Sequence, residues 1–279
     1  MIFQTAFTQK IEEKSLLWEI SGNGLEQTSY LYGTVHLVCK GEVIMTDLIQ
    51  NTFDKTTALA LEVDLSDPGI QIEMMKLSMS KDGKKISDGL DQETAEKLDQ
   101  LLQSKMSVPL AMMDALSPQM MLMQLSLFGL DCPMDLGYDY MFMQSAIAEE
   151  KEIIGLESIQ TQMDALFSQP DEEFFQAITY LVNNPDELKE QTSEVFSLYK
   201  NQEIQALYDY TKESYDDPKY PTSDIKVLLD NRNISWIPVI EAQISKESTF
   251  IAVGAAHLAG ENGVINLLKK QGYNLKPVL

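Results

Sequence analysis

The chain has 279 residues, of which 44% are hydrophobic, and its 43 acidic and 21 basic side chains give a formal net charge of -22 at pH 7. This length and composition allow a sizeable core, in one large domain or two small ones. Because such a charge repels nucleic-acid phosphates and anionic lipid surfaces, we expect no nucleic-acid partner. No stretch approaches the roughly 18 consecutive apolar residues of a membrane span, so we expect no transmembrane segment in this sequence.

The first part of the chain predicts a β-hairpin, a helix and a buried strand. Two apolar, strand-like runs at residues 16–20 and 29–37 flank a glycine-rich turn, which is typical of a hairpin. A helix is expected over about 43–53. A strand is expected over 57–63, where Glu62 interrupts an otherwise apolar run.

The middle of the chain is predicted to be largely helical. Helical patterns cover about 70–80, 92–104, 110–128, 137–149, 172–183, 185–213 with a break, and 223–246. One short strand at 152–156 interrupts these helices, and Glu157 follows it at the start of the next helix. Seven of the 15 methionines lie between Met106 and Met134, which indicates either an adaptable, groove-like binding surface or ordinary helix packing.

The last part of the chain predicts a βαβ unit with parallel pairing and a right-handed connection: a strand at 249–253, a helix at 261–271 and a strand at 274–279. We therefore predict an α/β fold, with a mixed central sheet built from two βα halves and a large helical insertion. One domain is expected over residues 1–279. Its α/β core would comprise about 15–68, 150–170 and 248–279, and the helical insertion about 70–149 and 171–246.

The only two histidines occur in the same local phrase, with a glycine three residues before each: Gly33 before His36, and Gly254 before His257. Each phrase closes a strand-like run. Both imidazoles are therefore expected just beyond the carboxyl ends of strands, on the same edge of the sheet, where α/β folds place a shared site. Each glycine would let the backbone or a substrate approach closely beside the imidazole.

Together with Glu62, the two histidines have the chemistry of a divalent-metal site. His36, His257 and Glu62 would supply two imidazoles and a carboxylate to Mn, Co or Zn and leave a position for water. A carboxylate in a buried strand is costly unless a cation or strong donors satisfy it. The reaction class of such a site would be metal-assisted hydrolysis. The alternative is that the histidines are structural and that Glu62 pairs with an arginine, for which Arg232 is a candidate.

Two further charged residues have open roles. Glu157 could cap its helix, or could point at a site beside the strand ends and assist proton transfer. Arg232 could hold Glu62 or Glu157, bind an anionic substrate through its bidentate fork, or lie on a solvated helix face.

The two cysteines, Cys39 and Cys132, also allow more than one interpretation. In an exported protein they could form a disulfide that closes a loop of roughly 90 residues, worth about 4 to 5 kcal/mol by chain entropy. In the cytosol they would be reduced, or one would be a third metal ligand. The first nine residues are similar to the tail of a secretory signal, and a frayed terminus explains them equally well.

At these residues the chain resembles the TraB/PrgY/GumN family, which is related to the Tiki membrane-anchored metalloproteases. The resemblance covers nearly the whole chain. It rests on Leu-Tyr-Gly-Thr-Val-His-Leu ending at Leu37, Leu-Glu-Val-Asp ending at Asp64, Gly-Leu-Glu-Ser-Ile-Gln ending at Gln160, the pair Arg232-Asn233, and Val-Gly-Ala-Ala-His-Leu-Ala-Gly ending at Gly260.

The resemblance implies an α/β fold with a helical insertion and, from the Tiki branch, a metal-dependent peptidase activity. It puts His36, Glu62 and His257 at the metal and catalytic centre. The resemblance also implies that four residues lie next to that centre as catalytic or substrate-binding residues: Glu157, Gln160, Arg232 and Asn233. It also makes Cys39 and Cys132 similar to the cysteine pair of exported bacterial members.

The function expected from the sequence is that of an exported bacterial metallohydrolase, in the periplasm or cell envelope, with a peptide or small-molecule substrate. The alternative is a protein without catalytic activity that binds a signalling peptide or haem, with the methionine-rich helices as its groove and the histidines as ligands.

Overall fold

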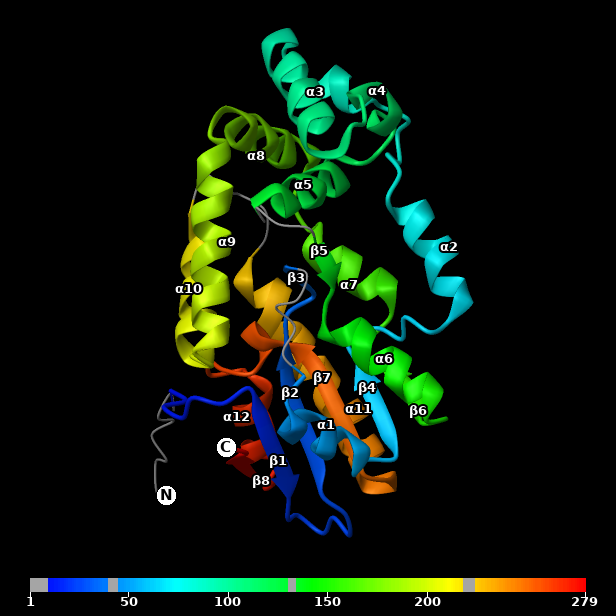
Figure 1. Cartoon of the computed structure of the whole chain (residues 1–279), viewed down its shortest axis with the longest axis vertical. Helices are drawn as coiled ribbons and strands as arrows, with labels where there is room; N and C mark the ends of the chain where they lie inside the picture. Colours follow the sequence, from blue (N-terminus) through cyan, green and yellow to red (C-terminus); the bar gives the residue numbers. More distant parts are fainter. Residues whose placement is uncertain (1–9, 40–44, 130–133, 218–223) are drawn as a thin grey trace, which may run out of the picture.

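A computed structural model describes residues 10–39, 45–129, 134–217 and 224–279. Its centre is a mixed six-stranded sheet in the order β6-β4-β7-β2-β1-β8 (Figure 1). Strands β6, β4, β7 and β2 are parallel, whereas β1 runs antiparallel to both β2 and β8. The strands are β1 (Leu17–Ser21), β2 (Ser29–Thr34), β4 (Ala58–Leu61), β6 (Glu152–Gly155), β7 (Thr249–Gly254) and β8 (Asn274–Pro277). The predicted α/β class and the N-terminal hairpin are confirmed.

Helices cover both faces of the sheet. On one face, aromatic rings from α1 and α6 pack on β7: Phe250 lies 5.5 Å from Phe53 and 4.7 Å from Phe142 between ring centroids. The other face is covered by α11 and α12 (Figure 1). These helices are α1 (Asp47–Asp54), α6 (Tyr138–Ala148), α11 (Asn231–Lys246) and α12 (Val264–Lys270). This arrangement makes β4 buried on both faces, as its continuous apolar run requires.

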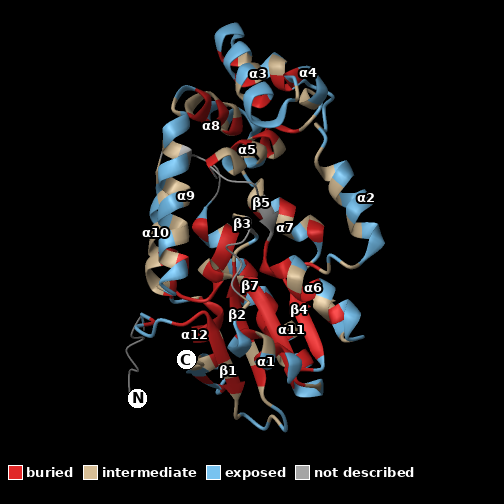
Figure 2. Cartoon of the chain, in the orientation of Figure 1, coloured by how far each residue is buried: buried red, intermediate tan, exposed pale blue. Residues whose placement is uncertain are grey.

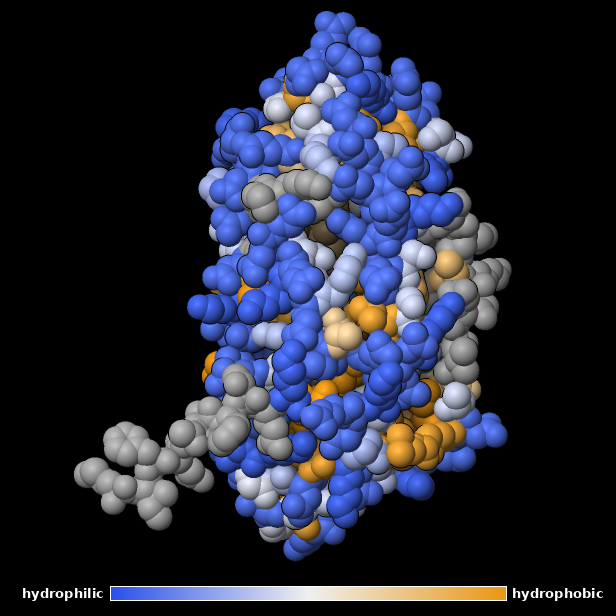
Figure 3. All heavy atoms as spheres, turned by 90° about the vertical axis from the view of Figure 1, so that its left-hand side faces the viewer, coloured by the Kyte–Doolittle hydropathy of each residue, from blue (hydrophilic) through white to orange (hydrophobic). Residues whose placement is uncertain are grey.

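The remaining helices extend beyond the carboxyl ends of the parallel strands and include much of the predicted helical insertion. They are α2 (Pro68–Leu77), α3 (Gln92–Met106), α4 (Leu110–Met113), α5 (Pro118–Ser126), α7 (Ile159–Leu166), α8 (Asp171–Asn183), α9 (Pro185–Lys200) and α10 (Ile204–Asp216). The bounds differ from the prediction, because α6 and α11 cover the sheet and α7 joins this group. Buried residues gather in the sheet and, as a second cluster that includes Leu98, Met121 and Ile178, between α3, α5 and α8 (Figure 2). The outer side formed by α9 and α10 is mostly hydrophilic (Figure 3).

The structure corrects the prediction of one helix over 110–128. Two helices, α4 and α5, occupy this stretch, because Ser117 accepts a hydrogen bond from the amide of Met120 as an N-cap and Pro118 begins the second helix. Proline lacks the amide hydrogen that a helix interior needs, so it favours the first turn. Within the methionine-rich stretch, Met121 is fully buried in the helical core, as ordinary packing requires, whereas Met112 and Met123 are exposed.

The C-terminal βαβ unit is also corrected. Strand β8 pairs with β1 and not with β7. A strand has two edges, and those of β7 are already taken by β2 and β4, so the last strand passes to the outer edge of the hairpin.

A second, two-stranded sheet lies near the first histidine. Strand β3 (Leu37–Cys39) pairs antiparallel with β5 (Met134–Leu136), with Cys39 opposite Met134. The predicted strand over 29–37 is therefore divided, and His36 lies between its two parts. Cys132 and residues 1–9 lie outside the described residues, so the disulfide and the export signal stay predictions. Within the described ranges, no helix is both long and apolar enough to span a bilayer.

Candidate active site

The two histidines and Glu62 lie at the same edge of the sheet, as their positions in the sequence predict. Strands β2 and β7 are adjacent and parallel, with Thr34 opposite Gly254. His36 follows β2, His257 ends the short 3-10 helix η4 (Ala255–His257) after β7, and Glu62 follows β4. The Oε1 atom of Glu62 lies 4.0 Å from Nε2 of His36 and 3.8 Å from Nε2 of His257.

Gly254 leaves open the space between these three side chains. Its amide donates a hydrogen bond of 2.8 Å to Oε1 of Glu62. A Cβ atom at this position would lie 3.3 Å from that oxygen, 3.5 Å from Nε2 of His36 and 3.6 Å from Cδ2 of His257. The missing side chain therefore keeps free the point on which two imidazoles and a carboxylate converge.

At Gly33 the first of the two predicted alternatives holds, because it is the backbone that approaches closely. A Cβ atom there would lie 2.7 Å from Cδ1 of Leu258 and 3.1 Å from Ala255, and Gly33 does not line the cavity over the histidines. The missing side chain at Gly33 thus permits close packing between β2 and the turn that follows β7.

His36 is oriented by an acid that the sequence did not reveal. Its Nδ1 lies 2.9 Å from Oδ2 of Asp139, at the start of α6. The other oxygen of Asp139 accepts a hydrogen bond of 2.9 Å from the hydroxyl of Thr34. With Nδ1 bonded to a carboxylate, the lone pair of Nε2 is the one available to the cavity once the ring is neutral.

His257 is oriented by Asn233, which the sequence did predict as a neighbour. Its Nδ1 lies 2.6 Å from Oδ1 of Asn233. The amide nitrogen of Asn233 donates to the carbonyls of His257 and Asn262, at 3.3 and 2.9 Å, and so fixes which end of the amide faces the ring. Nδ1 of His257 therefore carries the proton, and Nε2 points to Glu62.

Arg232 joins both carboxylates of the site to His257. It is the only arginine in the 279-residue sequence, and its side chain is 6% exposed. Nη2 donates to Oε2 of Glu62 at 2.6 Å, and Nε and Nη2 both donate to Oε1 of Glu157. Nη1 lies 3.2 Å from Nε2 of His257. The guanidinium thus compensates Glu62, as the alternative interpretation of the sequence required, and does so beside the histidines.

Glu157 lies behind Arg232 and does not line the cavity over the histidines. Its contacts make it an anchor for the guanidinium, which is one of the arrangements that the sequence left open; its catalytic role stays a prediction. Burial raises the pKa of Glu157, against the opposite effect of Arg232. For Glu62, burial acts in the same direction, but the imidazoles of His257 and His36 and the guanidinium of Arg232 hold the pKa far below its usual range.

The two histidines have opposite pKa shifts. Burial lowers the pKa of His257 to about 3, with the charge of Arg232 acting in the same direction against Glu62. Enclosure by the cavity walls also acts to lower the pKa of His36, although water reaches 62% of its side chain. Its hydrogen bond to Asp139 and the charges of Asp139 and Glu62 outweigh that effect and raise the pKa to about 9.

These shifts predict opposite pH dependences of stability. The pKa of His36 in the folded protein exceeds its ordinary value of 6.5. The contribution of this shift to the free energy of unfolding is therefore complete below about pH 6.5 and is lost as the pH rises through about 9. We expect the difference in melting temperature between the parent and His36→Gln, measured with a chelator present, to shrink over that interval. His257→Gln is the matched control: its difference should shrink instead as the pH falls below about 6.5. Equal slopes for the two variants would contradict the assignment.

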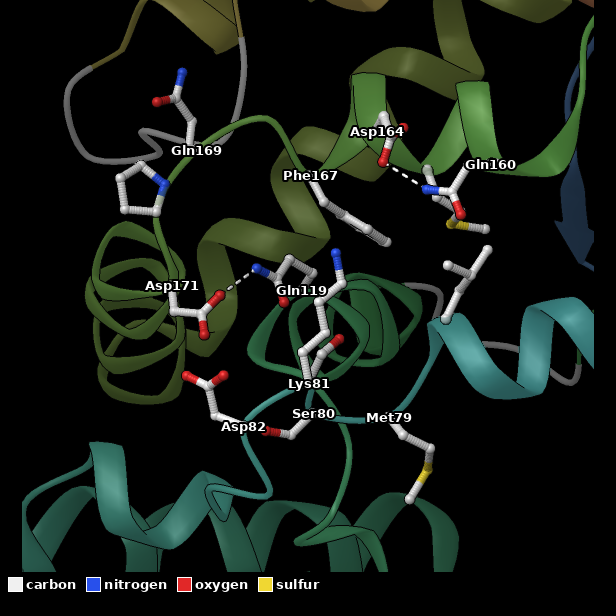
Figure 4. A pocket seen from close by; sticks show the side chains of 14 residues that line it. Met79, Ser80, Lys81, Asp82, Gln119, Gln160, Asp164, Phe167, Gln169 and Asp171 are labelled. Atoms are coloured by element: carbon white, nitrogen blue, oxygen red, sulfur yellow. Dashed lines mark hydrogen bonds between the residues drawn. The ribbon is translucent and has the colours of Figure 1, made fainter.

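Gln160 is not brought to the site, whereas Gln162 is. The amide of Gln160 donates to Asp164 at 2.7 Å, and its side chain lines a different cavity (Figure 4). Gln162 donates to Oε2 of Glu62 at 2.8 Å. Two positions apart on α7, the two side chains project about 200° apart around the helix. The prediction therefore named the right helix and the wrong face.

The imidazoles and the carboxylate of the site are suitable ligands for a divalent ion. Their separations, however, are larger than those of ligands around a bound ion. Within the described ranges, no three His, Cys, Asp or Glu side chains stand ready to hold a metal. Tetrahedral ligands at about 2.1 Å from an ion lie about 3.4 Å apart, so the separations of 4.0 and 3.8 Å from Glu62 to the two histidines exceed this by about half an ångström. His36, Glu62 and His257 fit a divalent ion if Arg232 keeps its hydrogen bonds to Glu157 and its Nη1 no longer contacts Nε2 of His257.

A comparison with family models adds the last observation. The model described as the TraB/PrgY/gumN family matches residues 16–277. The chain belongs to this family. The match covers every strand of the central sheet, and both histidine phrases, Glu62 and the Arg232-Asn233 pair lie within it. No curated protein and no solved structure gives a match to this TraB/PrgY/gumN chain.

Proposed function

We propose that this TraB/PrgY/gumN protein is a divalent-metal-dependent hydrolase that cleaves peptide bonds, and that it acts outside the cytoplasm of a bacterial cell. The convergence of His36, Glu62 and His257 on the space beside Gly254 carries the proposal. The export part is supported by the sequence alone, through the N-terminal residues and the two cysteines.

His36, Glu62 and His257 would hold the ion, for which Mn, Co and Zn are candidates. Such an ion polarises a carbonyl and lowers the pKa of water, which is the chemistry that peptide hydrolysis needs. The chain itself fixes the ligands: Asp139 and Asn233 bond the distal nitrogens of the two rings, as partners of metal-ligating histidines do.

Arg232 has a second task in this proposal. Its Nη1 faces Nε2 of His257, so it lies where a substrate carbonyl oxygen would gain negative charge, and it can donate to that oxygen. Glu157 keeps the guanidinium in place through Nε and Nη2. The walls of the cavity, which has a volume of about 470 Å³, are mainly apolar, and such low-polarity surroundings strengthen these interactions.

Metal uptake tests the proposal. Protein purified without chelator, then titrated with Mn, Co and Zn, is expected to bind one ion by elemental analysis and calorimetry. His36→Ala and His257→Ala should each lose this binding while the far-UV spectrum is retained. Thr211→Ala, a polar residue of the same cavity outside the ligand set, is the control. A histidine variant that takes up metal like the parent would refute the ligand assignment.

Cleavage is tested on a peptide library with each metal. Products that require the metal and disappear in both histidine variants are expected.

The second candidate function, capture of a signalling peptide or haem without turnover, is favoured by Met74, Met123 and Met163, which line the cavity with adaptable apolar side chains. Stable peptide binding without products, or a haem absorption band on titration, would support that function instead.

A further inference from the structure

Two further cavities adjoin the cavity over the histidines. A middle cavity of about 230 Å³ shares Met123, Leu166 and Tyr215 with the histidine cavity. A far cavity of about 320 Å³, drawn in Figure 4, shares Gln119 and Phe167 with the middle one. Met163 lines both the far and the histidine cavities. Because they share walls, the three cavities adjoin one another between the sheet edge and helices α5 and α7, and we refer to the three together as the groove.

The chemistry of the walls changes along this groove. Close to the histidines the walls are mainly aliphatic, with Val35, Leu61 and Leu229 among them. The far cavity is lined by Phe167 together with amide, hydroxyl and charged side chains (Figure 4). The polar side chains of the middle and far cavities include Gln119, Gln191, Ser214, Gln160, Gln169 and Ser80.

We propose that the far cavity is a second binding subsite, which holds the chain of an extended polypeptide several residues away from the bond at the histidines. The substrate class is then a polypeptide with a minimum length, in place of a small molecule. The identity of the bond at the histidines rests on the proposed hydrolase function, whereas the binding along the groove does not.

Hydrogen bonding favours a polypeptide as the occupant. Each peptide group presents one donor and one acceptor at regular intervals, and a glutamine amide can serve both. Gln119 uses its nitrogen on Asp171 at 2.6 Å, whereas Gln169 lies at the edge of the cavity with its amide directed away from the other labelled side chains (Figure 4). An acyl chain would cover these amides without bonding them, which costs the desolvation of each group.

The charges of the far cavity point the same way. Its charged side chains are Asp82, Asp164 and Asp171 against Lys81. The resulting acidic surplus, in a chain of net charge -22, repels the carboxylate or phosphate of a lipid headgroup and attracts a basic side chain. An extended polypeptide with apolar residues at the histidine end and a basic residue at the far end matches both parts of the groove.

Binding of an unfolded protein tests the subsite without any need for turnover. Fluorescein-labelled, dephosphorylated casein is titrated with the full chain in the presence of a chelator, and anisotropy is read. Unlabelled casein should displace the label, whereas an exhaustive digest of the same casein to dipeptides and tripeptides should compete about tenfold less well at equal mass. Palmitate should not displace it.

A blocking variant locates the binding. Gln169→Trp puts an indole at the edge of the far cavity, which Gln169 lines, and should weaken casein binding about tenfold. Gln176→Trp is the matched control, because Gln176 is exposed on α8 and does not line the groove. Melting temperatures of both variants confirm that they fold.

Four outcomes overturn the subsite: no casein binding, equal competition by the short peptides, displacement by palmitate, or equal binding by both tryptophan variants. The hydrolase proposal fails separately. If casein binding depends on Gln169 and no metal supports cleavage, the subsite stands and the hydrolase does not. If tripeptides are cleaved and the Gln169 variant acts on long chains like the parent, the hydrolase stands and the subsite does not.

Discussion

Replacing Arg232 by methionine is expected to destabilise the fold by about 3 to 5 kcal/mol, the usual cost of leaving a buried charge unpaired. The change removes the partner of Glu62 and Glu157, whose side chains are 6% and 3% exposed. It also removes the donor to the carbonyl of Leu228. Urea unfolding followed by far-UV circular dichroism measures the loss.

Two controls distinguish the effect of unpairing the buried carboxylates from the effect of simply removing a cation. Lys246→Met removes a cation from the other end of the same helix, where Lys246 pairs with Glu152 in an exposed position, and should have a far smaller effect. Adding Glu157→Gln to Arg232→Met should recover part of the lost stability, because one buried negative charge is then gone. If Arg232→Met unfolds at the same urea concentration as Lys246→Met, the central ion pairs contribute little.

Gly254→Ala is expected to lower metal-dependent hydrolysis by about 100-fold while leaving the fold intact. The new methyl group would occupy the space between Glu62, His36 and His257, at 3.3 to 3.6 Å from each. The backbone of Gly254, with φ of -51° and ψ of 136°, is open to any residue, so no strain is expected. Metal affinity by calorimetry and initial rates on a cleaved peptide measure the effect.

Gly33→Ala is the counterpart of that substitution at the other histidine phrase. Its methyl group would press on Leu258 and Ala255, at 2.7 and 3.1 Å, and should cost about 1 to 3 kcal/mol by overpacking. Metal affinity per folded molecule should be unchanged. If Gly33→Ala loses metal binding and Gly254→Ala keeps it, the roles assigned to the two glycines are reversed.

Much of the fold could be predicted because hydrophobic patterns and turns are local. The hairpin of β1 and β2, the buried run of β4 and the strand of β7 all follow from short stretches of sequence. The neighbours of β8 could not be predicted, because pairing depends on which strand edges are still open after the rest of the chain has folded. The division of α4 from α5 carried a visible signal, Ser117 before Pro118, which the continuous apolar pattern outweighed.

The site was predictable where a strand end fixes the position of a residue. His36, Glu62 and His257 each follow a strand of the same sheet, so the parallel topology brings them together. Asp139 reaches His36 from a helix about one hundred positions along the chain, and nothing in the spacing indicates the contact. Gln162 was missed because the rotation of α7 about its axis depends on packing.

The solitary arginine also provides a means of finding ligands before any substrate is known. A protease specific for arginine has one bond to cut, between Arg232 and Asn233, and both residues are buried in α11. Cleavage into fragments of residues 1–232 and 233–279 therefore requires that helix to open. A compound that binds the folded site slows the appearance of the two fragments in proportion to its affinity, so candidate ligands can be ranked on a gel without an assay of activity.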